Sequence, residues 1–360
     1  MKKSVLVAMS GGVDSSVSLL LLKQQGYDCI GAMMNLYDSD NSQAEESQTD
    51  GVCGSLRDVD DARKVANSLG VPFHVYDFTD NFRKNIIQQF VDSYVSGATP
   101  NPCIECNRYM KFGNLFNCTK ECDAEFFATG HYARIEQDSK TGRYLLKKAL
   151  DETKDQSYYL YSLSQEQLSR SLFPLGELRK SEVREIAAKN GFDNANKSDS
   201  QDICFVRDGD YAGFIERFSN ASFEPGNFID THGNILGKHK GLIRYTVGQR
   251  KGLGISLNKP MYVLSKNTVE NTVTLCGDNE LFSTSLDAKH FNLIAYDKLD
   301  SPIRVAAKIR YAHIPQSALA TPTSENTLRL EFDEPQRAIT KGQAVVLYDD
   351  DVVIGGGTIC

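Results

Sequence analysis

One short stretch, residues 10–16 (Ser-Gly-Gly-Val-Asp-Ser-Ser), combines glycines, hydroxyls and a carboxylate between two apolar runs, residues 5–9 and 17–22. The first run is typical of a buried strand, and the second has the pattern of a helix. A helix start leaves backbone N–H groups unpaired, and its dipole favours an anion. The glycines allow close approach, the serines can donate to phosphate oxygens, and Asp14 is a candidate Mg²⁺ ligand. The stretch therefore predicts a phosphate-binding loop, although not a Walker loop, because no Gly-Lys-Ser/Thr follows.

Three of the nine cysteines lie in segments that suggest chemistry. Cys103 and Cys106 frame Cys-Ile-Glu-Cys after Thr-Pro-Asn-Pro, and Cys204 lies in Ser-Gln-Asp-Ile-Cys-Phe. The two prolines predict an extended approach that places Cys106 at a helix start, where the thiolate is stabilised. Zinc is disfavoured because no second Cys-x-x-Cys or His pair is visible. Buried structural thiols and redox or sulfur-transfer chemistry both stay open.

Length and composition indicate a globular protein of two or three domains. The chain has 360 residues, of which 41% are hydrophobic and 24% charged, and its net charge is −7. No apolar run approaches the ~20 residues that a membrane span needs, so we expect no membrane partner. An odd number of cysteines without a repeating frame fits a reducing compartment, and we expect a cytoplasmic location.

The charges are unevenly distributed along this acidic chain. Residues 231–269 and 301–324 contain no Asp or Glu but ten Lys or Arg. Two basic tracts suggest a polyanion docked at one face, and a solvated basic surface is the alternative. The basic residues of these tracts are Lys238, Lys240, Arg244, Arg250, Lys251, Lys259, Lys266, Arg304, Lys308 and Arg310.

The elements that must position these residues alternate between strand and helix in the first third. Strands are expected at residues 4–9, 28–36, 72–78, 124–129 and 143–149, helices at 16–25, 57–69, 80–95, 107–122, 156–170 and 180–190, and a loop at 37–55. Such alternation predicts an α/β domain with a doubly wound parallel sheet. Ligands then bind beyond the carboxyl ends of the strands, so the loop, Met34 and Gly130-His131 are expected to converge on one nucleotide. From about residue 220 the pattern becomes all-β.

Five motifs occur here in order: Ser-Gly-Gly-Val-Asp-Ser, Asn-Pro-x-x-x-Cys-Asn, Thr-Gly-His-Tyr-Ala-Arg, Lys-Asp-Gln-Ser-Tyr and Tyr-Thr-Val-Gly-Gln-Arg-Lys-Gly-Leu-Gly. Together they closely resemble the bacterial tRNA-specific 2-thiouridylases of the ATP pyrophosphatase (PP-loop) superfamily. The resemblance implies an adenine-nucleotide alpha-hydrolase-like catalytic domain over residues 1–215, a small β-rich tRNA-contacting domain over 216–280, and a C-terminal β-barrel over 281–360.

The resemblance also implies a reaction. Such enzymes use ATP with Mg²⁺ to adenylate the C2 carbonyl of the wobble uridine in tRNAs for Lys, Glu and Gln, and a persulfide sulfur then displaces AMP. By the same resemblance Cys204 would carry the persulfide, delivered by a sulfur-relay protein or cysteine desulfurase. Cys106 would be the nucleophile that attacks it, leaving a transient Cys106–Cys204 disulfide.

Binding residues carry over in the same way, and no resident metal site is implied. Those matched to the nucleotide are Ala8, Met9, Ser10, Gly11, Gly12, Val13, Asp14, Ser15, Met34 and Gly130. Those matched to tRNA are Asn101, Pro102, Cys103, His131, Lys154, Asp155, Gln156, Arg310, Tyr311 and Gln343, the first three around the target base.

One departure from the family pattern keeps a second mechanism open. Many members have Asp where this chain has Cys103, so the site would hold three cysteines, Cys103, Cys106 and Cys204. Three thiolates could hold an iron–sulfur cluster with one open iron. Two other functions are weighed: an amide-forming ATP pyrophosphatase acting on a small metabolite, and a nucleotide- or nucleic-acid-binding module without catalysis.

Overall fold

The structure, a computed structural model, describes residues 2–37, 56–197, 203–206 and 209–360. The predicted loop at 37–55 therefore lies, apart from Tyr37, outside the described residues. The chain forms two compact units. Unit 1 comprises residues 1–86, 103–207 and 351–353, and unit 2 comprises residues 87–102, 208–350 and 354–360. No helix in the described ranges is long and apolar enough to cross a membrane.

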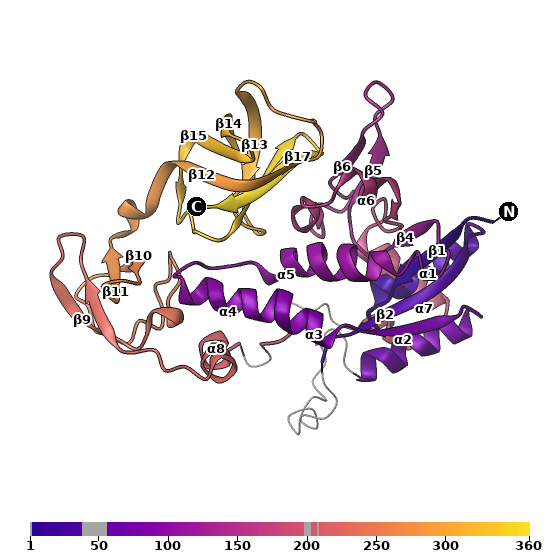
Figure 1. Ribbon diagram of the computed structural model, residues 1–360, viewed down its shortest axis with the longest axis horizontal. Coiled ribbons are helices and arrows are strands. Elements are labelled where there is room, and N and C mark those ends of the chain that lie inside the picture. The colour runs from indigo at the N-terminus through magenta and orange to yellow at the C-terminus, as the bar shows by residue number, and fades with distance from the viewer. Residues whose placement is uncertain (1, 38–55, 198–202, 207–208) are drawn as a thin grey trace. The chain divides into compact units, whose positions relative to one another are not determined.

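Unit 1 is built on a five-stranded sheet in the order β3-β2-β1-β4-β7, of which Figure 1 labels β1, β2 and β4. All neighbouring strands in it run parallel. The strands are β1 (Ser4–Ala8), β2 (Asp28–Asn35), β3 (Phe73–Asp77), β4 (Phe126–Ala128) and β7 (Ser171–Leu172). The chain moves outward from β1 in one direction and then from β4 in the other. The carboxyl ends of β1 and β4 therefore form the switch point at which open α/β sheets bind ligands.

Both faces of this sheet are covered, which confirms the predicted doubly wound fold. Val5 and Val7 of β1 pack in a core with α1 (Val13–Gln24), α2 (Leu56–Ser68) and α7 (Lys180–Lys189). On β4, Phe127 points to the opposite face, because side chains alternate along a strand. Its ring meets Phe112 edge-on at 5.5 Å. That phenylalanine belongs to η2 (Cys106–Leu115), a π-helical continuation of the short helix α5 (Pro102–Glu105).

Most helices lie where the pattern predicted them, with shifted ends. The helix expected at 80–95 is a continuous run of α3 (Thr79–Phe82), the π-helical η1 (Arg83–Ile87) and α4 (Gln88–Val95). The single helix expected at 156–170 is wrong. A 3₁₀ turn, η3 (Ser157–Leu160), precedes α6 (Gln165–Ser169), because Ser164 and Gln167 form a capping box that begins a new helix.

Residues 134–196 hold three further elements, two strands and a 3₁₀ turn, of which only the second strand was expected from the sequence. Strand β6 (Tyr144–Lys147) was expected, but β5 (Arg134–Gln137), its antiparallel partner, was not. Its four residues alternate too briefly to stand out. The 3₁₀ turn η4 (Asp193–Asn196) follows α7.

Unit 2 is largely β, as predicted for the chain after residue 220. A four-stranded sheet has the order β10-β11-β8-β9, and Phe228, Val263 and Val273 lie in its core. Its members are β8 (Gly226–Ile229), β9 (Ile235–His239), β10 (Tyr262–Asn267) and β11 (Thr272–Cys276). Helix α8 (Tyr211–Ser219) packs against α4 through Phe90 and Phe214, and the 3₁₀ turn η5 (Leu242–Arg244) follows β9.

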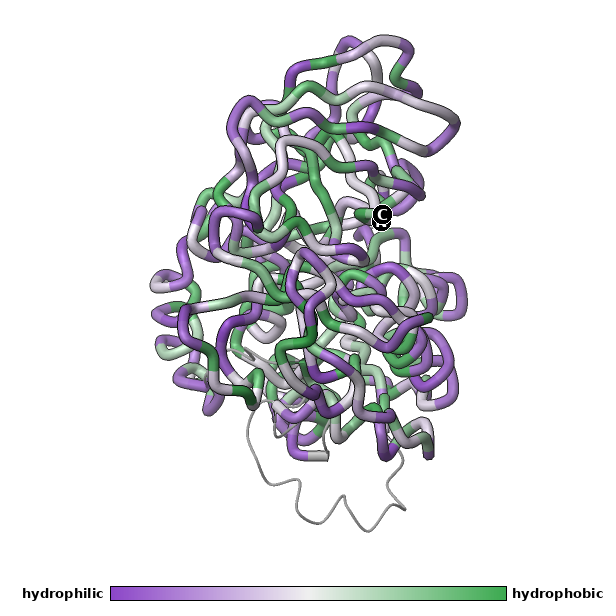
Figure 2. Tube along the Cα trace, turned by 90° about the vertical axis from the view of Figure 1, so that its left-hand side faces the viewer, coloured by the Kyte–Doolittle hydropathy of each residue, from purple (hydrophilic) through white to green (hydrophobic). Residues whose placement is uncertain are grey.

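The C-terminal strands close into the predicted barrel. Their order is β12-β15-β14-β13-β16-β17, and β12 also pairs with β17. The 3₁₀ turn η6 (Asp278–Leu281) leads into this barrel. The barrel strands are β12 (Phe282–Leu293), β13 (Ile303–Lys308), β14 (Gln316–Ser324), β15 (Thr327–Arg337), β16 (Ala344–Asp349) and β17 (Val352–Ile359). Buried and exposed residues alternate along much of β15, whereas β16 and most of β17 are buried without alternation. In Figure 2 many of the loops at the edge of the trace are hydrophilic.

Candidate functional site

The loop at residues 10–16 leaves β1 and enters α1 at the switch point of the sheet. Gly12 is the N-cap of α1 and supplies no side-chain acceptor, so the first-turn N–H groups of this twelve-residue helix have no side-chain cap. Within the loop, Ser10 N–H donates to Ser15 Oγ at 3.1 Å, and that hydroxyl donates to Gly12 O at 3.0 Å. The loop is thus held in shape by its own serines, and its open helix end suits an anion.

Two glycines are required by close packing around this loop. Gly11 has φ +72°, and a Cβ there would lie 2.6 Å from Asp58 O. Gly130, just beyond β4, lies so close to the loop that a Cβ would come within 2.9 Å of Asp14 C and Ser15 N. The two strand ends therefore meet, as the parallel sheet predicted. Met34 lies one residue before the carboxyl end of β2 and is half-buried.

Asp14 is already engaged by two groups that sequence reasoning missed. Lys180 Nζ lies 2.8 Å from both carboxylate oxygens, and Tyr132 Oη donates to Oδ1 at 2.9 Å. Lys180 is buried and occupies the first position of α7, where the helix dipole disfavours a cation. A lysine at the first position of a helix is unusual, and this position could have indicated from the sequence that Lys180 has a role in the site.

Asp14 is not part of a larger cluster of metal-binding side chains in the described ranges. No three His, Cys, Asp or Glu side chains of the described ranges are grouped as a metal centre requires. The carboxylate of Asp14 is held by Lys180 and Tyr132, and its magnesium role stays a prediction, because Mg²⁺ bound with ATP needs only one or two carboxylates besides the phosphates. Lys180 places a fixed positive charge beside the loop.

A second lysine, half-buried Lys197, pairs with two carboxylates of α2. Lys197 Nζ contacts Asp58 Oδ1 at 2.7 Å and Asp61 Oδ2 at 3.0 Å. Burial opposes its charge, but hydrogen bonds to the two carboxylates outweigh burial and raise the Lys197 pKa. Nearby, Asn194 Nδ2 donates to Gly11 O at 3.0 Å. The Asn194 amide therefore holds the backbone of the loop at Gly11.

The three cysteines all belong to unit 1. Cys103 is exposed, while Cys106 and Cys204 are half-buried. The expectation that Cys106 begins a helix is wrong. The helix begins at Pro102, whose missing N–H and fixed φ suit the first helical position, so Cys103 lies in the first turn and Cys106 one turn later. The first-turn position expected for Cys106 is therefore occupied by Cys103.

Helix α3 is a neighbour of both cysteine segments. The ring of Phe82 on α3 meets Phe205, the residue after Cys204, at 5.9 Å. Helix α3 also packs against η2, which begins with Cys106. Beside Cys106, Asn107 is buried and its Oδ1 has no hydrogen-bond partner in the described chain. An unsatisfied buried acceptor costs ~1–3 kcal/mol, so a donor from a ligand would be favoured there.

The predicted iron–sulfur ligands do not form a cluster site in this structure. Cys103, Cys106 and Cys204 are all described, yet no group of three metal-binding side chains is found among the described residues. The residues present therefore do not fit a cluster in this conformation.

His131 is buried rather than exposed to a large ligand. Its Nδ1 lies 2.7 Å from Thr129 Oγ1 and its Nε2 lies 3.4 Å from Lys111 Nζ. Because an ammonium only donates, Nε2 accepts and the ring proton sits on Nδ1, directed at Thr129. Burial, and secondly the charge of Lys111, lower the His131 pKa well below 6.5.

The His131 environment predicts an acid sensitivity with a definite sign. The folded protein keeps the ring neutral, whereas the unfolded chain binds a proton below pH 6.5, so stability is complete above that pH and is lost as pH falls. His131→Asn should reduce the loss of unfolding free energy between about pH 7.5 and about pH 5.5 by ~1.4 kcal/mol. Urea unfolding of both proteins at the two pH values measures this. An equal loss in both proteins would contradict a buried neutral ring.

The residues matched to tRNA differ in their availability. Asp155 is buried, and its carboxylate accepts from Ala149 N–H at 3.1 Å and from Ser157 Oγ at 2.9 Å. Gln156 Oε1 accepts from Tyr132 N–H at 3.0 Å. These side chains organise the segment itself, while Lys154 is half-exposed.

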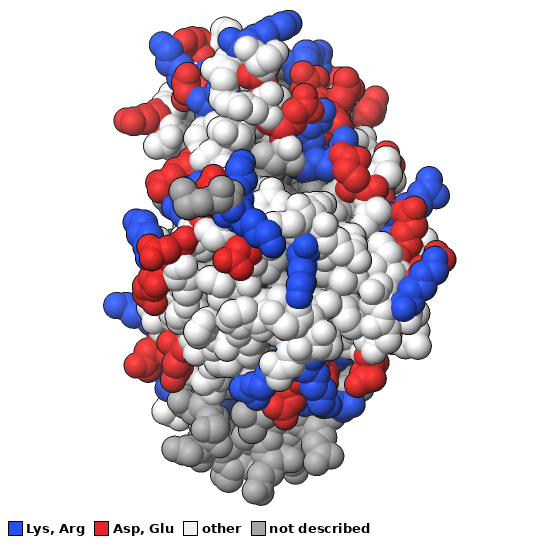
Figure 3. All heavy atoms as spheres, turned by 90° about the vertical axis from the view of Figure 1, so that its right-hand side faces the viewer, with Lys and Arg blue, Asp and Glu red and all other residues white. Residues whose placement is uncertain are grey.

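In unit 2, the matched residues also make contacts within the chain. Arg310 donates to Arg337 O at 3.2 Å, and Lys308 Nζ lies 5.4 Å from the ring centre of half-exposed Tyr311. On the face drawn in Figure 3, basic and acidic side chains alternate and neither sign forms a continuous patch.

Gln343 ties the barrel to the segment that precedes the Cys-Ile-Glu-Cys motif. Its Nε2 donates to Thr99 O at 2.9 Å, and Thr99 N–H donates to Lys341 O at 2.9 Å. Between them, Gly342 has φ +91°, and a Cβ there would lie 3.0 Å from Thr99 N. This clamp fixes residues 99–100, two residues before the helix that carries Cys103 begins.

The clamp predicts a stability effect that a purely tRNA-contacting residue would not show. Gln343→Glu preserves shape but replaces the donor with a carboxylate facing a carbonyl oxygen. We expect the unfolding free energy to fall by ~1–3 kcal/mol, measured by urea unfolding without tRNA. Unchanged stability with weakened tRNA binding would instead assign Gln343 to tRNA alone.

Three family descriptions match consecutive parts of the chain. A tRNA methyl transferase HUP domain matches residues 3–208, a tRNA methyl transferase PRC-barrel domain matches 212–277, and an aminomethyltransferase beta-barrel domain matches 283–359. The first alone spans more than half of the chain.

Curated relatives match over the whole length. The tRNA-specific 2-thiouridylase MnmA of Clostridioides difficile is 52% identical over 360 residues, covering 100% of this chain and 98% of the relative. That of Acetivibrio thermocellus is 51% identical over 359 residues, covering 99% of each. A 4-thiouridine synthetase–RNA complex with bound ATP is 16% identical, covers 61% of this chain and 50% of its own, and has a TM-score of 0.34, which is too low to support an argument.

Proposed function

Because the chain belongs to the tRNA-specific 2-thiouridylase family, an enzyme family of tRNA sulfur transfer, we propose that it converts the wobble uridine of tRNAs for Lys, Glu and Gln to 2-thiouridine. One observation carries the proposal. A loop with an open helix end and two half-buried cysteines, Cys106 and Cys204, belong to the same compact unit. The same unit therefore supplies the loop for ATP and the cysteines for sulfur transfer.

The first step makes the uridine oxygen a leaving group. Uridine O2 attacks the α-phosphorus of ATP, pyrophosphate departs, and O2 becomes bonded to AMP. The N–H groups at the start of α1 and the ammonium of Lys180, held 2.8 Å from Asp14, stabilise the negative charge that develops on the phosphates. The nucleotide-binding set is the one that the sequence resemblance gave, with Lys180 added.

The second step replaces that oxygen with sulfur. Cys204 carries a persulfide received from a sulfur-relay protein or cysteine desulfurase. The Cys106 thiolate attacks the Cys204 sulfur, the S–S bond breaks, and hydrosulfide leaves as a Cys106–Cys204 disulfide forms. Hydrosulfide adds to C2, AMP leaves with the original oxygen, and a thiol reductant reopens the disulfide with two electrons.

The tRNA must present its wobble base outside the stack, because a stacked base hides C2. We propose that Asn101, Pro102 and Cys103 line the base, with the thiol of Cys103 as an acid/base group. Residues 1–215 would supply catalysis, and the domains at 216–280 and 281–360 would hold the tRNA.

One experiment distinguishes the proposed reaction from two other activities, methyl transfer and amide formation. The matched domain descriptions mention methyl transfer, and an amide-forming pyrophosphatase would also split ATP. The protein is incubated with mixed tRNA, ATP and a persulfide donor, and the tRNA nucleosides are analysed by mass spectrometry. We expect ATP-dependent 2-thiouridine. A methylated uridine, or pyrophosphate release without any change in tRNA, would contradict the proposal.

A further inference from the structure

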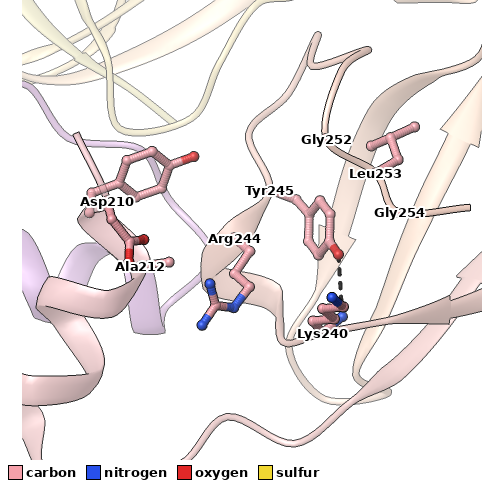
Figure 4. Close-up of a pocket in the computed structure, with 9 residues that line it drawn as sticks. Asp210, Ala212, Lys240, Arg244, Tyr245, Gly252, Leu253 and Gly254 are labelled. Carbon is pink, nitrogen blue, oxygen red and sulfur yellow. Dashed lines mark hydrogen bonds between the residues drawn. The ribbon is translucent and has the colours of Figure 1, made fainter. Parts of the chain in front are cut away.

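A cavity of about 320 Å³ lies in unit 2, outside the unit that holds the loop and the three cysteines. Three segments form it: the start of α8, the chain around η5, and a glycine-containing loop that precedes β10 (Figure 4). None of the residues matched to nucleotide or tRNA by the family motifs lines it. The lining residues are Asp210, Tyr211, Ala212, Lys240, Arg244, Tyr245, Gly252, Leu253 and Gly254.

The cavity carries positive charge that the chain does not fully neutralise. Lys240 is exposed and has no acidic partner among the described residues. Arg244 uses one edge of its guanidinium on Glu216, at 2.7 Å, and both side chains are 34% exposed. A guanidinium has five donors, so others remain for a ligand. Asp210 is the acidic lining residue, and its carboxylate caps α8 by accepting from Gly213 N–H at 3.0 Å.

Backbone donors add to this charge. Gly252 and Gly254 both have φ +75°, a conformation that glycine adopts without strain. Their N–H groups make no hydrogen bond within the described chain. Unpaired backbone donors beside Lys240 and Arg244 form the kind of concavity that binds oxyanions. Leu253, Ala212 and the Tyr245 ring give the cavity an apolar side.

We propose that this cavity binds a backbone phosphate of the tRNA substrate, with the adjoining ribose against its apolar side. The inference rests on the proposed function, and deepens it by assigning a phosphate contact to a cavity that includes part of the fifth motif, residues 245–254. Neighbouring charge favours RNA over a small anion, because Lys238, Arg250 and Lys251 are exposed in an acid-free tract that flanks the cavity. A phosphate contact positions the tRNA and reads no sequence.

The test compares two cavity variants with a matched control. Lys240→Ala and Arg244→Gln remove cavity charge, while Lys289→Ala removes an exposed lysine of the same unit, on β12, outside both basic tracts. Binding of fully transcribed tRNA is measured across a series of salt concentrations. Each cavity variant should bind about tenfold more weakly and lower the slope of log K against log salt by about one. The losses should be equal for all bound tRNAs.

The outcomes separate this inference from the proposed function. Wild-type affinity and salt slope in both cavity variants, with tRNA bound normally, would overturn the phosphate site alone. An equal loss in Lys289→Ala would replace it with a diffuse surface effect. If tRNA binding is retained but transfer from a protein persulfide donor is lost, the cavity belongs to the donor. No tRNA binding by the wild-type protein would contradict the proposed function as well.

Discussion

Cys204→Ser is expected to abolish 2-thiouridine formation by at least ~1,000-fold, because a serine cannot carry the transferable sulfur. Cys106→Ser should do the same, since the persulfide would then have no thiolate to release its sulfur. Both variants should still bind tRNA and release one equivalent of pyrophosphate. The assay combines nucleoside mass spectrometry with single-turnover pyrophosphate release.

A matched control shows whether these losses are specific. Cys122 is half-buried in the same unit, and its sulfur lies 3.1 Å from Tyr76 Oη. A serine hydroxyl can replace that hydrogen bond, so Cys122→Ser should thiolate normally. Retained thiolation in either Cys106→Ser or Cys204→Ser would refute the roles assigned to them.

The Cys103→Ser variant distinguishes the persulfide mechanism, in which Cys106 releases sulfur from the Cys204 persulfide, from a three-cysteine iron–sulfur cluster. The persulfide mechanism needs only Cys106 and Cys204, so this variant should be slower but active, and the anaerobically purified wild-type protein should be colourless. Brown, iron-containing protein that becomes colourless in Cys103→Ser would favour the three-cysteine cluster.

Gly12→Ala is expected to abolish ATP binding without loss of stability. A Cβ at Gly12 meets only Ser10 Oγ, at 3.4 Å, so the folded chain accommodates it. The same methyl group would stand at the open start of α1, where the phosphates must approach the backbone. ATP affinity and urea unfolding are measured together. Normal ATP affinity would show that the phosphates bind elsewhere.

Gly11→Ala should behave differently, which makes it the informative partner. Gly11 has φ +72°, and its Cβ would collide with Asp58 backbone atoms at 2.6 Å and 2.7 Å. We expect loss of both ATP binding and stability, the latter by at least ~1–2 kcal/mol. Equal stability in the two variants would contradict the packing of the loop against α2.

Local patterns predicted the sheet and the loop because their causes are local. The apolar run at β1 and the small residues after it specify a strand, a turn and a helix without help from distant parts. Parallel order then brings Gly130 to the loop. By contrast, Lys180 and Tyr132 reach Asp14 from residues more than a hundred positions away, and no periodicity encodes that contact.

The cysteine helix shows how a correct motif can be placed wrongly. The two prolines predict an extended approach that ends at Cys106. Pro102 instead starts the helix, because proline is well suited to the first helical position, and this moves Cys106 one turn inward. The Gln343 clamp was equally hidden, since it depends on a barrel turn that closes on residues 99–100.

The fate of the uridine oxygen tests the central claim most directly. A tRNA carrying a heavy-oxygen isotope at O2 of the wobble uridine is incubated with the protein, unlabelled ATP and a persulfide donor. Adenylation at O2 followed by attack of sulfur on C2 predicts one labelled oxygen in each AMP, with one 2-thiouridine formed per AMP. Label found in water or pyrophosphate, with unlabelled AMP, would contradict the account.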